Sequence, residues 1–132
     1  MMTAKPQSLL RSILTRLGLL AIGKIPVVTN ATGTGAISTT YAPSAHFQLE
    51  NVTVHFSSAP TTSENLTITI NANDGSDYDT VILSRDPSLT SDTDILFLPE
   101  SPVLCESGDA IDVAYTNTDG RTFGLRIVAT LV

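Results

Sequence analysis

The stretch "NLTITINANDGSDYDTVIL", residues 65–83, places two apolar runs on either side of a short acidic segment that contains one glycine. From Leu66 to Ile70 apolar side chains alternate with threonines, the period of two expected of a strand with one buried face. The dipeptide Asp74-Gly75 is typical of a hairpin turn, because glycine accepts the positive φ that such turns need. The second run, residues 79–84 ("DTVILS"), is continuously apolar at its centre and predicts a strand covered on both faces.

The same short period continues through the chain from residue 46. Further strands are predicted in "HFQLENVTVHFSS", "TDILFLP", "AIDVAYT" and "TFGLRIVATLV", and turn residues bound nearly all of them. In the first of these the apolar positions change parity, which predicts a β-bulge near Glu50 and Asn51. "TDILFLP", like residues 79–84, predicts a strand covered on both faces. Such spacing indicates an antiparallel sandwich or a small barrel, and of these we expect an all-β, jelly-roll-like antiparallel β-sandwich.

The first 44 residues differ from the rest and predict an N-terminal arm. Residues 6–21 carry apolar side chains at helical spacing, with polar side chains opposite, which predicts an amphipathic helix that begins at Pro6. Residues 29–45 ("TNATGTGAISTTYAPSA") are small, hydroxylated and interrupted by glycine, which predicts a linker or an extended arm. The sequence therefore divides into a helix-and-linker arm at 1–44 and a β-sandwich domain at 45–132.

Charge is distributed as unevenly as composition. The arm holds two lysines and two arginines without any acid, a net +4, whereas the domain holds all 13 acids against three arginines, a net −10. Nucleic acid and anionic lipid both require clustered cations, so we expect no nucleic-acid partner and no membrane partner. The apolar runs are shorter than the roughly 20 residues of a transmembrane helix.

The basic start and the stretch "LGLLAIG" also fit a secretory signal. Against that alternative, the apolar run is short, and the charge of Lys24 interrupts the residues after it. An amphipathic helix is therefore the favoured interpretation of this segment.

The acidic segment between the two apolar runs offers carboxylates that could bind calcium. With Gly75 at the sixth position of an EF-hand loop, apolar residues occupy two of the first three ligand positions and also the twelfth, so it is not an EF-hand. A looser calcium site formed by Asp74, Asp77 and Asp79 stays open as an alternative. A hairpin turn with solvated acids explains the same residues more simply, and it is the favoured interpretation.

Residues suited to catalysis or to metal binding are few. His46 and His55 are the only histidines, both at polar positions of one strand and about 30 Å apart at roughly 3.3 Å per residue, so we expect solvated side chains that share no metal. The single Cys105 excludes an intramolecular disulfide and predicts a packed thiol whose pKa is raised beside Glu106. No nucleophile or phosphate-loop motif is present, so the prediction is a protein that is not an enzyme and has no cofactor.

Three stretches, "FSSAPTTSENLTITINANDGSDYDTVILSRDPS", "TDILFLPES" and "SGDAIDVAYTNTDGRTFGLRIVATLV", resemble small β-rich proteins encoded among the structural genes of tailed bacteriophages. The resemblance spans about residues 46–132 and is most specific at residues 59–65 and 108–111. It implies a virion protein: a capsid decoration, neck, tail or fibre-associated subunit. It also implies capsid, neck or tail proteins as partners and a homo-oligomeric state. No catalytic residue is carried over by it.

Two interpretations of function stay open. In the first, the protein is a non-enzymatic structural component of the virion that assembles through the apolar face of its helix, although that face would equally pack on its own sandwich. The residues of this predicted interface are Leu9, Leu10, Ile13, Leu14, Leu17 and Leu20. In the second, the sandwich is a binding or adhesion module for a carbohydrate or cell-surface ligand, assisted by calcium, with loops at 57–65, 73–79 and 117–121.

Overall fold

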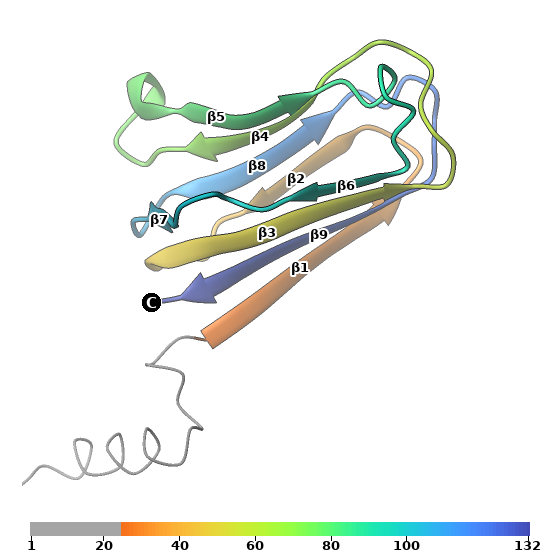
Figure 1. Cartoon of the computed structure of the whole chain (residues 1–132). Coiled ribbons are helices and arrows are strands. Elements are labelled where there is room, and N and C mark those ends of the chain that lie inside the picture. The colour runs from red at the N-terminus through yellow and green to blue at the C-terminus, as the bar shows by residue number, and fades with distance from the viewer. Residues whose placement is uncertain (1–24) are drawn as a thin grey trace, which may run out of the picture.

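The computed structural model describes residues 25–132, which form two antiparallel β-sheets and almost no helix (Figure 1). The elements are β1 (Ile25–Gly33), β2 (Ile37–Tyr41), β3 (Phe47–Phe56), β4 (Leu66–Asn71), the short 3-10 helix η1 (Ser76–Tyr78), β5 (Thr80–Arg85), β6 (Asp94–Phe97), β7 (Val103–Cys105), β8 (Ala110–Tyr115) and β9 (Phe123–Leu131). The all-β prediction is confirmed. The predicted helix at 6–21, with its proposed interface, lies outside the described residues. Within residues 25–132 no helix is long and apolar enough to cross a lipid bilayer.

The strands divide between two sheets that share one hydrophobic core. The first sheet has the order β1-β9-β3-β6, with β7 also paired to β3, and the second has the order β2-β8-β4-β5. Successive strands change sheet at every connection except β4–β5 and β6–β7, so the chain winds around the core. The strand edges of the first sheet are therefore β1 and the β6–β7 side, and those of the second are β2 and β5.

The core follows the predicted parities of the central strands. Its largest fully buried side chains include Phe47, Leu49, Phe56, Leu66, Ile68, Ile111 and Ile127. Two aromatic contacts cross between the sheets: Tyr41 meets Phe47 edge-on at 5.2 Å, and Tyr115 meets Phe56 at 5.4 Å. Each contact joins a strand of the second sheet to β3 of the first. The two contacts lie at opposite ends of β3, at Phe47 and Phe56.

The predicted β-bulge in β3 is confirmed. The register between β3 and β9 shifts between Leu49 and Asn51, so Glu50 is the extra residue. Its carboxylate accepts hydrogen bonds from the side chains of Gln48 (3.2 Å) and Thr130 (2.8 Å). Because the bulge changes parity, the apolar side chains on both sides of it point into the core.

The interpretation of residues 29–45 as a linker is wrong. β1 pairs with β9 over nine residues, and β2 pairs with β8. Ile37 and Tyr41 of β2 are buried in the core. Both strands lie at sheet edges, where every second side chain faces solvent. Serine, threonine and asparagine occupy those positions, so the sequence resembles that of a linker. The sandwich therefore includes residues 25–44, and the predicted boundary after residue 44 cuts through it.

The expectation that residues 79–84 and "TDILFLP" form strands covered on both faces is also wrong. They form β5 and β6, which are edge strands. Val81 of β5 and Leu96 of β6 have 57% and 59% of their surface exposed. A continuous apolar run shows that both faces are apolar, but it does not show that both are covered.

Gly108, in the turn between β7 and β8, yields a first stability prediction. Its φ is +98°, and a Cβ there would lie 2.6 Å from Cγ of Asn73. Gly108→Ala should therefore lower the free energy of unfolding by about 1–3 kcal/mol, because the backbone is strained and Asn73 must move. Gly35→Ala is the control, since no atom lies within 4 Å of its Cβ position. Equal stabilities of the two variants in chemical denaturation would contradict the prediction.

Candidate functional site

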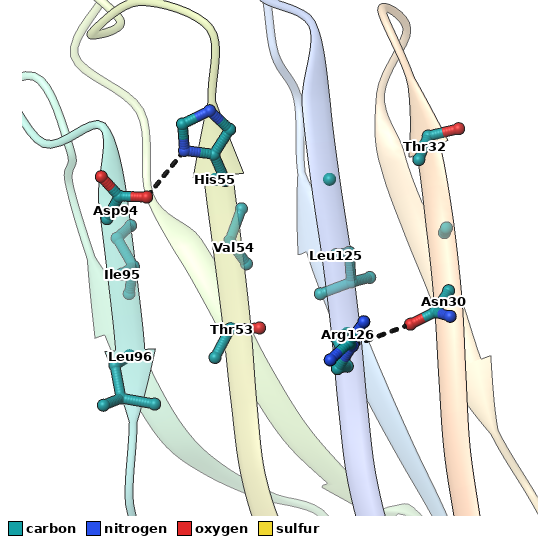
Figure 2. A pocket seen from close by; sticks show the side chains of 12 residues that line it. Asn30, Thr32, Thr53, Val54, His55, Asp94, Ile95, Leu96, Leu125 and Arg126 are labelled. Atoms are coloured by element: carbon teal, nitrogen blue, oxygen red, sulfur yellow. Dashed lines mark hydrogen bonds and ion pairs between the residues drawn. The ribbon is translucent and has the colours of Figure 1, made fainter.

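A shallow groove of about 610 Å³ lies on the outer face of the first sheet, across β1, β9, β3 and β6 (Figure 2). Two cross-strand rows of outward side chains form it. The first row is Thr32, Gly124, His55 and Asp94, and the second is Asn30, Arg126, Thr53 and Leu96. Because Gly124 has no side chain and its Cβ position is open, the middle of the first row is hollow.

Two polar contacts lie on opposite sides of this groove (Figure 2). His55 Nδ1 and Asp94 Oδ1 are 2.7 Å apart, with 65% and 74% of the two side chains exposed. The hydrogen bond with His55, and a second from Thr93, lower the pKa of Asp94. On the other side, Arg126 Nε donates to Asn30 Oδ1 at 3.2 Å. The groove thus presents a guanidinium and a histidine–carboxylate pair to solvent.

The polar side chains of the groove are suited to binding a ligand. In the described part of the chain, the side chain of His55 has only Asp94 as a hydrogen-bond partner. Both groups are exposed to water, which screens their charges. The arrangement can recognise a polar or anionic group, and threonine hydroxyls and Leu96 add further contacts.

The acidic segment predicted as a turn, or alternatively as a calcium site, forms the connection between β4 and β5. Gly75 has φ +127°, and Oδ1 of Asp79 accepts the N–H of Ala72 at 2.8 Å, which closes the loop. The hairpin interpretation is confirmed. Residues 25–132 contain no group of three histidine, cysteine or acidic side chains placed to hold a metal ion, so Asp74 and Asp77 do not gather with Asp79 around one.

The two histidines and the cysteine have the solvent exposure that the sequence predicts. His46 and His55 are exposed, so solvated side chains are confirmed. Cys105 is buried, and burial raises the pKa of its thiol to about 11. The charge that adds to this rise is that of Asp109, whereas the sequence pointed to Glu106. A thiol in this state is a packing group and a poor nucleophile at neutral pH.

The three loops proposed for ligand binding do not form one surface. Residues 57–65 and 117–121 meet at one end of the sandwich, whereas residues 73–79 lie at the opposite end (Figure 1). At the shared end, Asp119 accepts the backbone N–H groups of Thr61 (2.7 Å) and Thr62 (2.9 Å). Sequence reasoning missed this network, because its partners are more than 50 residues apart and no local pattern joins them.

Asp119 yields a prediction about pH. Hydrogen bonds from the Thr62 side chain and from the backbone of Thr62 and Thr61 hold its pKa well below its usual range. Its stabilising contribution is therefore present above the unfolded-state pKa of about 3.9 and is lost as pH falls through the lower folded-state value. Asp119→Asn should melt earlier than wild type at pH 7 and lose less stability on acidification. Asp77→Asn removes the same charge elsewhere; identical pH profiles for the two variants would contradict the prediction.

Two viral structures are among the known proteins to which the chain is similar. No family model and no curated protein matches the chain. It is similar to a chain of the acidic stable capsid structure of Helicobacter pylori bacteriophage KHP30, at 14% identity and TM-score 0.42, over 82% of this chain and 93% of that one. It is also similar to a chain of infectious bursal disease virus Gx strain, at 15% identity and TM-score 0.24, over 80% of this chain and 38% of that one. Both scores are too low to bear on function.

Proposed function

We propose that the protein is a structural subunit of a tailed-bacteriophage virion, with a jelly-roll fold, that assembles with copies of itself and with other virion proteins. The observation that carries the proposal is a nested set of antiparallel pairs. β1 pairs with β9, β2 with β8, β3 with β6 and β7, and β4 with β5. A long hairpin rolled around a core produces this order.

The β6 and β7 strands act as one interrupted strand in this scheme. β6 pairs with residues 52–55 of β3, and β7 pairs with residues 47–49 of the same strand. Two prolines, Pro99 and Pro102, fall in the interruption. With β6 and β7 counted as one strand, the described residues form eight strands. Eight is the number of strands in a jelly roll, an architecture that occurs in viral capsid and lectin domains. The fold does not choose between these classes, and the sequence resemblance to phage structural proteins favours the first.

Exposed aliphatic side chains on the first sheet also support a subunit role. Val28, Leu96, Leu98 and Leu104 are 51%, 59%, 60% and 70% exposed. All four belong to the first sheet or to the segment between β6 and β7. Leu96, Leu98 and Leu104 lie along the β6–β7 edge, and neighbouring subunits in a particle would cover them and Val28 on the opposite edge.

The N-terminal segment supplies the second half of the proposal. It carries a net +4 with no acid, and it leads directly into β1 of a domain that carries a net −10. Opposite charges accelerate association and favour the correct partner. The apolar face from Leu9 to Leu20 docks on a neighbouring subunit in this proposal, in the manner of a helix in a groove.

Solution mass measured by light scattering tests the proposal. The full chain should be oligomeric. Leu10→Asp with Leu17→Asp, on the apolar face, should reduce the mass. Ser12→Asp with Thr15→Asp is the matched control, because it adds the same charge on the polar face and should leave the mass unchanged. A monomeric full chain, or equal masses for the two double variants, would overturn assembly through this face.

A second candidate function is a binding module, which the open groove at Gly124 favours. Gly124→Leu would fill the hollow between Thr32 and His55. A glycan array probed with the full chain and with this variant tests it. Binding that the variant abolishes supports a ligand site, and absence of binding by the full chain excludes glycans.

A further inference from the structure

We propose that β1 is a self-pairing edge: it pairs antiparallel with β1 of a second copy and joins the first sheets of two sandwiches into one continuous sheet. The inference deepens the proposed function, because it names a surface through which two copies meet. It does not depend on the N-terminal segment, and it rests entirely on described residues.

The outward hydrogen-bonding groups of β1 can be deduced from the ladder of its neighbour. Ser57 N–H donates to the carbonyl of Thr122 at 2.8 Å, which fixes one hydrogen-bonded pair between β3 and β9. Such pairs alternate in an antiparallel ladder, so Gly124 and Arg126 of β9 also direct their backbone groups to β3. Their partners on β1 are Thr32 and Asn30, which therefore point their N–H and C=O groups away from the sheet.

The N-terminal half of β1 has its backbone groups directed outward at the same alternate positions, although the bulge in β3 interrupts the ladder between β3 and β9. Val132 N–H donates to the carbonyl of His46 at 3.2 Å, so Thr130 faces β3. Its partner on β1 is Pro26, which therefore faces outward. Proline has no backbone N–H to donate, so a sheet tolerates it at an edge position whose backbone faces away from the neighbouring strand. Alternation then places Val28 with the outward set as well.

The other edges of the sandwich carry several features that discourage pairing, whereas β1 carries one, Pro26, near its N-terminal end. β2 has five residues, and β6 and β7 have four and three with two prolines between them. β5 is paired to β4 with a register shift and ends at Arg85, which forms an ion pair with Asp92 at 2.7 Å. Short length, bulges, charge and proline are the usual protections of an edge. β1 is nine residues long and has no charged residue.

A second copy of β1 fits this edge better than an arbitrary partner. The described domain is strongly acidic, so two copies repel each other wherever their acids meet. The β1 edge contains no acid, so two copies can approach there without like-charge contact. A two-fold axis brings the same strand against itself in antiparallel order, as an isologous dimer requires. The exposed side chains of Ile25 and Val28 lie next to the joint, where the added strand would cover part of their surface.

Amide hydrogen exchange of the full chain, followed by NMR, tests the inference. In the assembled protein, the outward N–H groups of Val28, Asn30 and Thr32 should exchange about 100-fold more slowly than in dilute monomer. The N–H groups of Thr29 and Ala31 face β9 and serve as the internal reference. Slow exchange of all five positions supports edge pairing. Slow exchange of the reference positions alone, in a protein that light scattering shows to be oligomeric, overturns it.

Substitutions at Val28 separate backbone pairing from side-chain contact. Val28→Pro removes an outward N–H without removing a bond to β9, and should restore fast exchange at Asn30 and Thr32. Val28→Ala keeps the N–H and should keep them protected. Protection that persists when the wild-type protein is diluted to monomer would mean that the same chain covers the edge, and would overturn pairing between copies. The double variant Leu10→Asp with Leu17→Asp should leave β1 protected, so failure of arm-mediated assembly is distinguishable from failure of this inference.

Discussion

A chain that begins at residue 45 should not fold, whereas a chain that begins at residue 25 should unfold in one cooperative transition. The first deletion removes β1 and β2, one edge strand from each sheet. It unpairs nine residues of β9 and strips Ile37 and Tyr41 from the core. Burial of each such side chain contributes about 1.5–3 kcal/mol, and with the lost strand pairing the total approaches the roughly 5–15 kcal/mol by which domains are stable.

Circular dichroism during heating distinguishes the two chains. The chain of residues 25–132 should show a β-sheet spectrum and a sharp melting transition. The chain of residues 45–132 should show neither. A cooperative transition in the shorter chain would mean that the two edge strands are dispensable, and that the boundary predicted after residue 44 is a true domain boundary.

Asn117→Ala should have the largest effect of any single substitution outside the hydrophobic core, about 2–4 kcal/mol. Asn117 is 4% exposed and has φ +54°. Its Nδ2 donates to the carbonyls of Thr34 (3.1 Å), Gly35 (2.9 Å) and Arg121 (2.9 Å). One amide therefore joins the β1–β2 turn to the β8–β9 turn. A hydrogen bond contributes about 0.5–1.5 kcal/mol net, so the loss of three part-buried ones together accounts for this cost.

Two controls separate the hydrogen bonds from the backbone strain at Asn117. Asn117→Gly relieves the positive φ and still removes the side chain, so it should remain strongly destabilising. Ser91→Ala changes another residue with positive φ (+50°), which is exposed, and should cost less than about 1 kcal/mol. Denaturant unfolding gives the three values. A cost for Asn117→Gly as small as that for Ser91→Ala would show that the amide network contributes little.

The parts of the fold that the sequence predicts are those governed by local alternation. Burial on one face forces a period of two, so the inward positions of β3, β4, β8 and β9 and the bulge at Glu50 could be read from the residues alone. β1 and β2 could not, because an edge strand buries little and its small polar side chains resemble those of a linker. Whether β5 and β6 are covered depends on neighbours distant in sequence.

The candidate sites were harder to predict than the fold. The turn at Asp74-Gly75 is local, and the prediction for it is confirmed. The groove at Gly124 depends on cross-strand registry among four strands, and the end held by Asp119 and Asn117 depends on contacts across more than 50 residues. No pattern within a short window contains that information. The arm interface from Leu9 to Leu20 stays a prediction.

The pairing of the first and last strands has a mechanical consequence. Ile25 and Leu131 lie opposite each other at one end of the antiparallel β1–β9 pair, so both ends of the domain leave from the same corner. Tension applied between them would break the pair one rung at a time, from that corner inward, because the force acts along the hydrogen bonds. Force spectroscopy should therefore record a low unfolding force. A domain that is held by both ends would therefore peel open at β1 first.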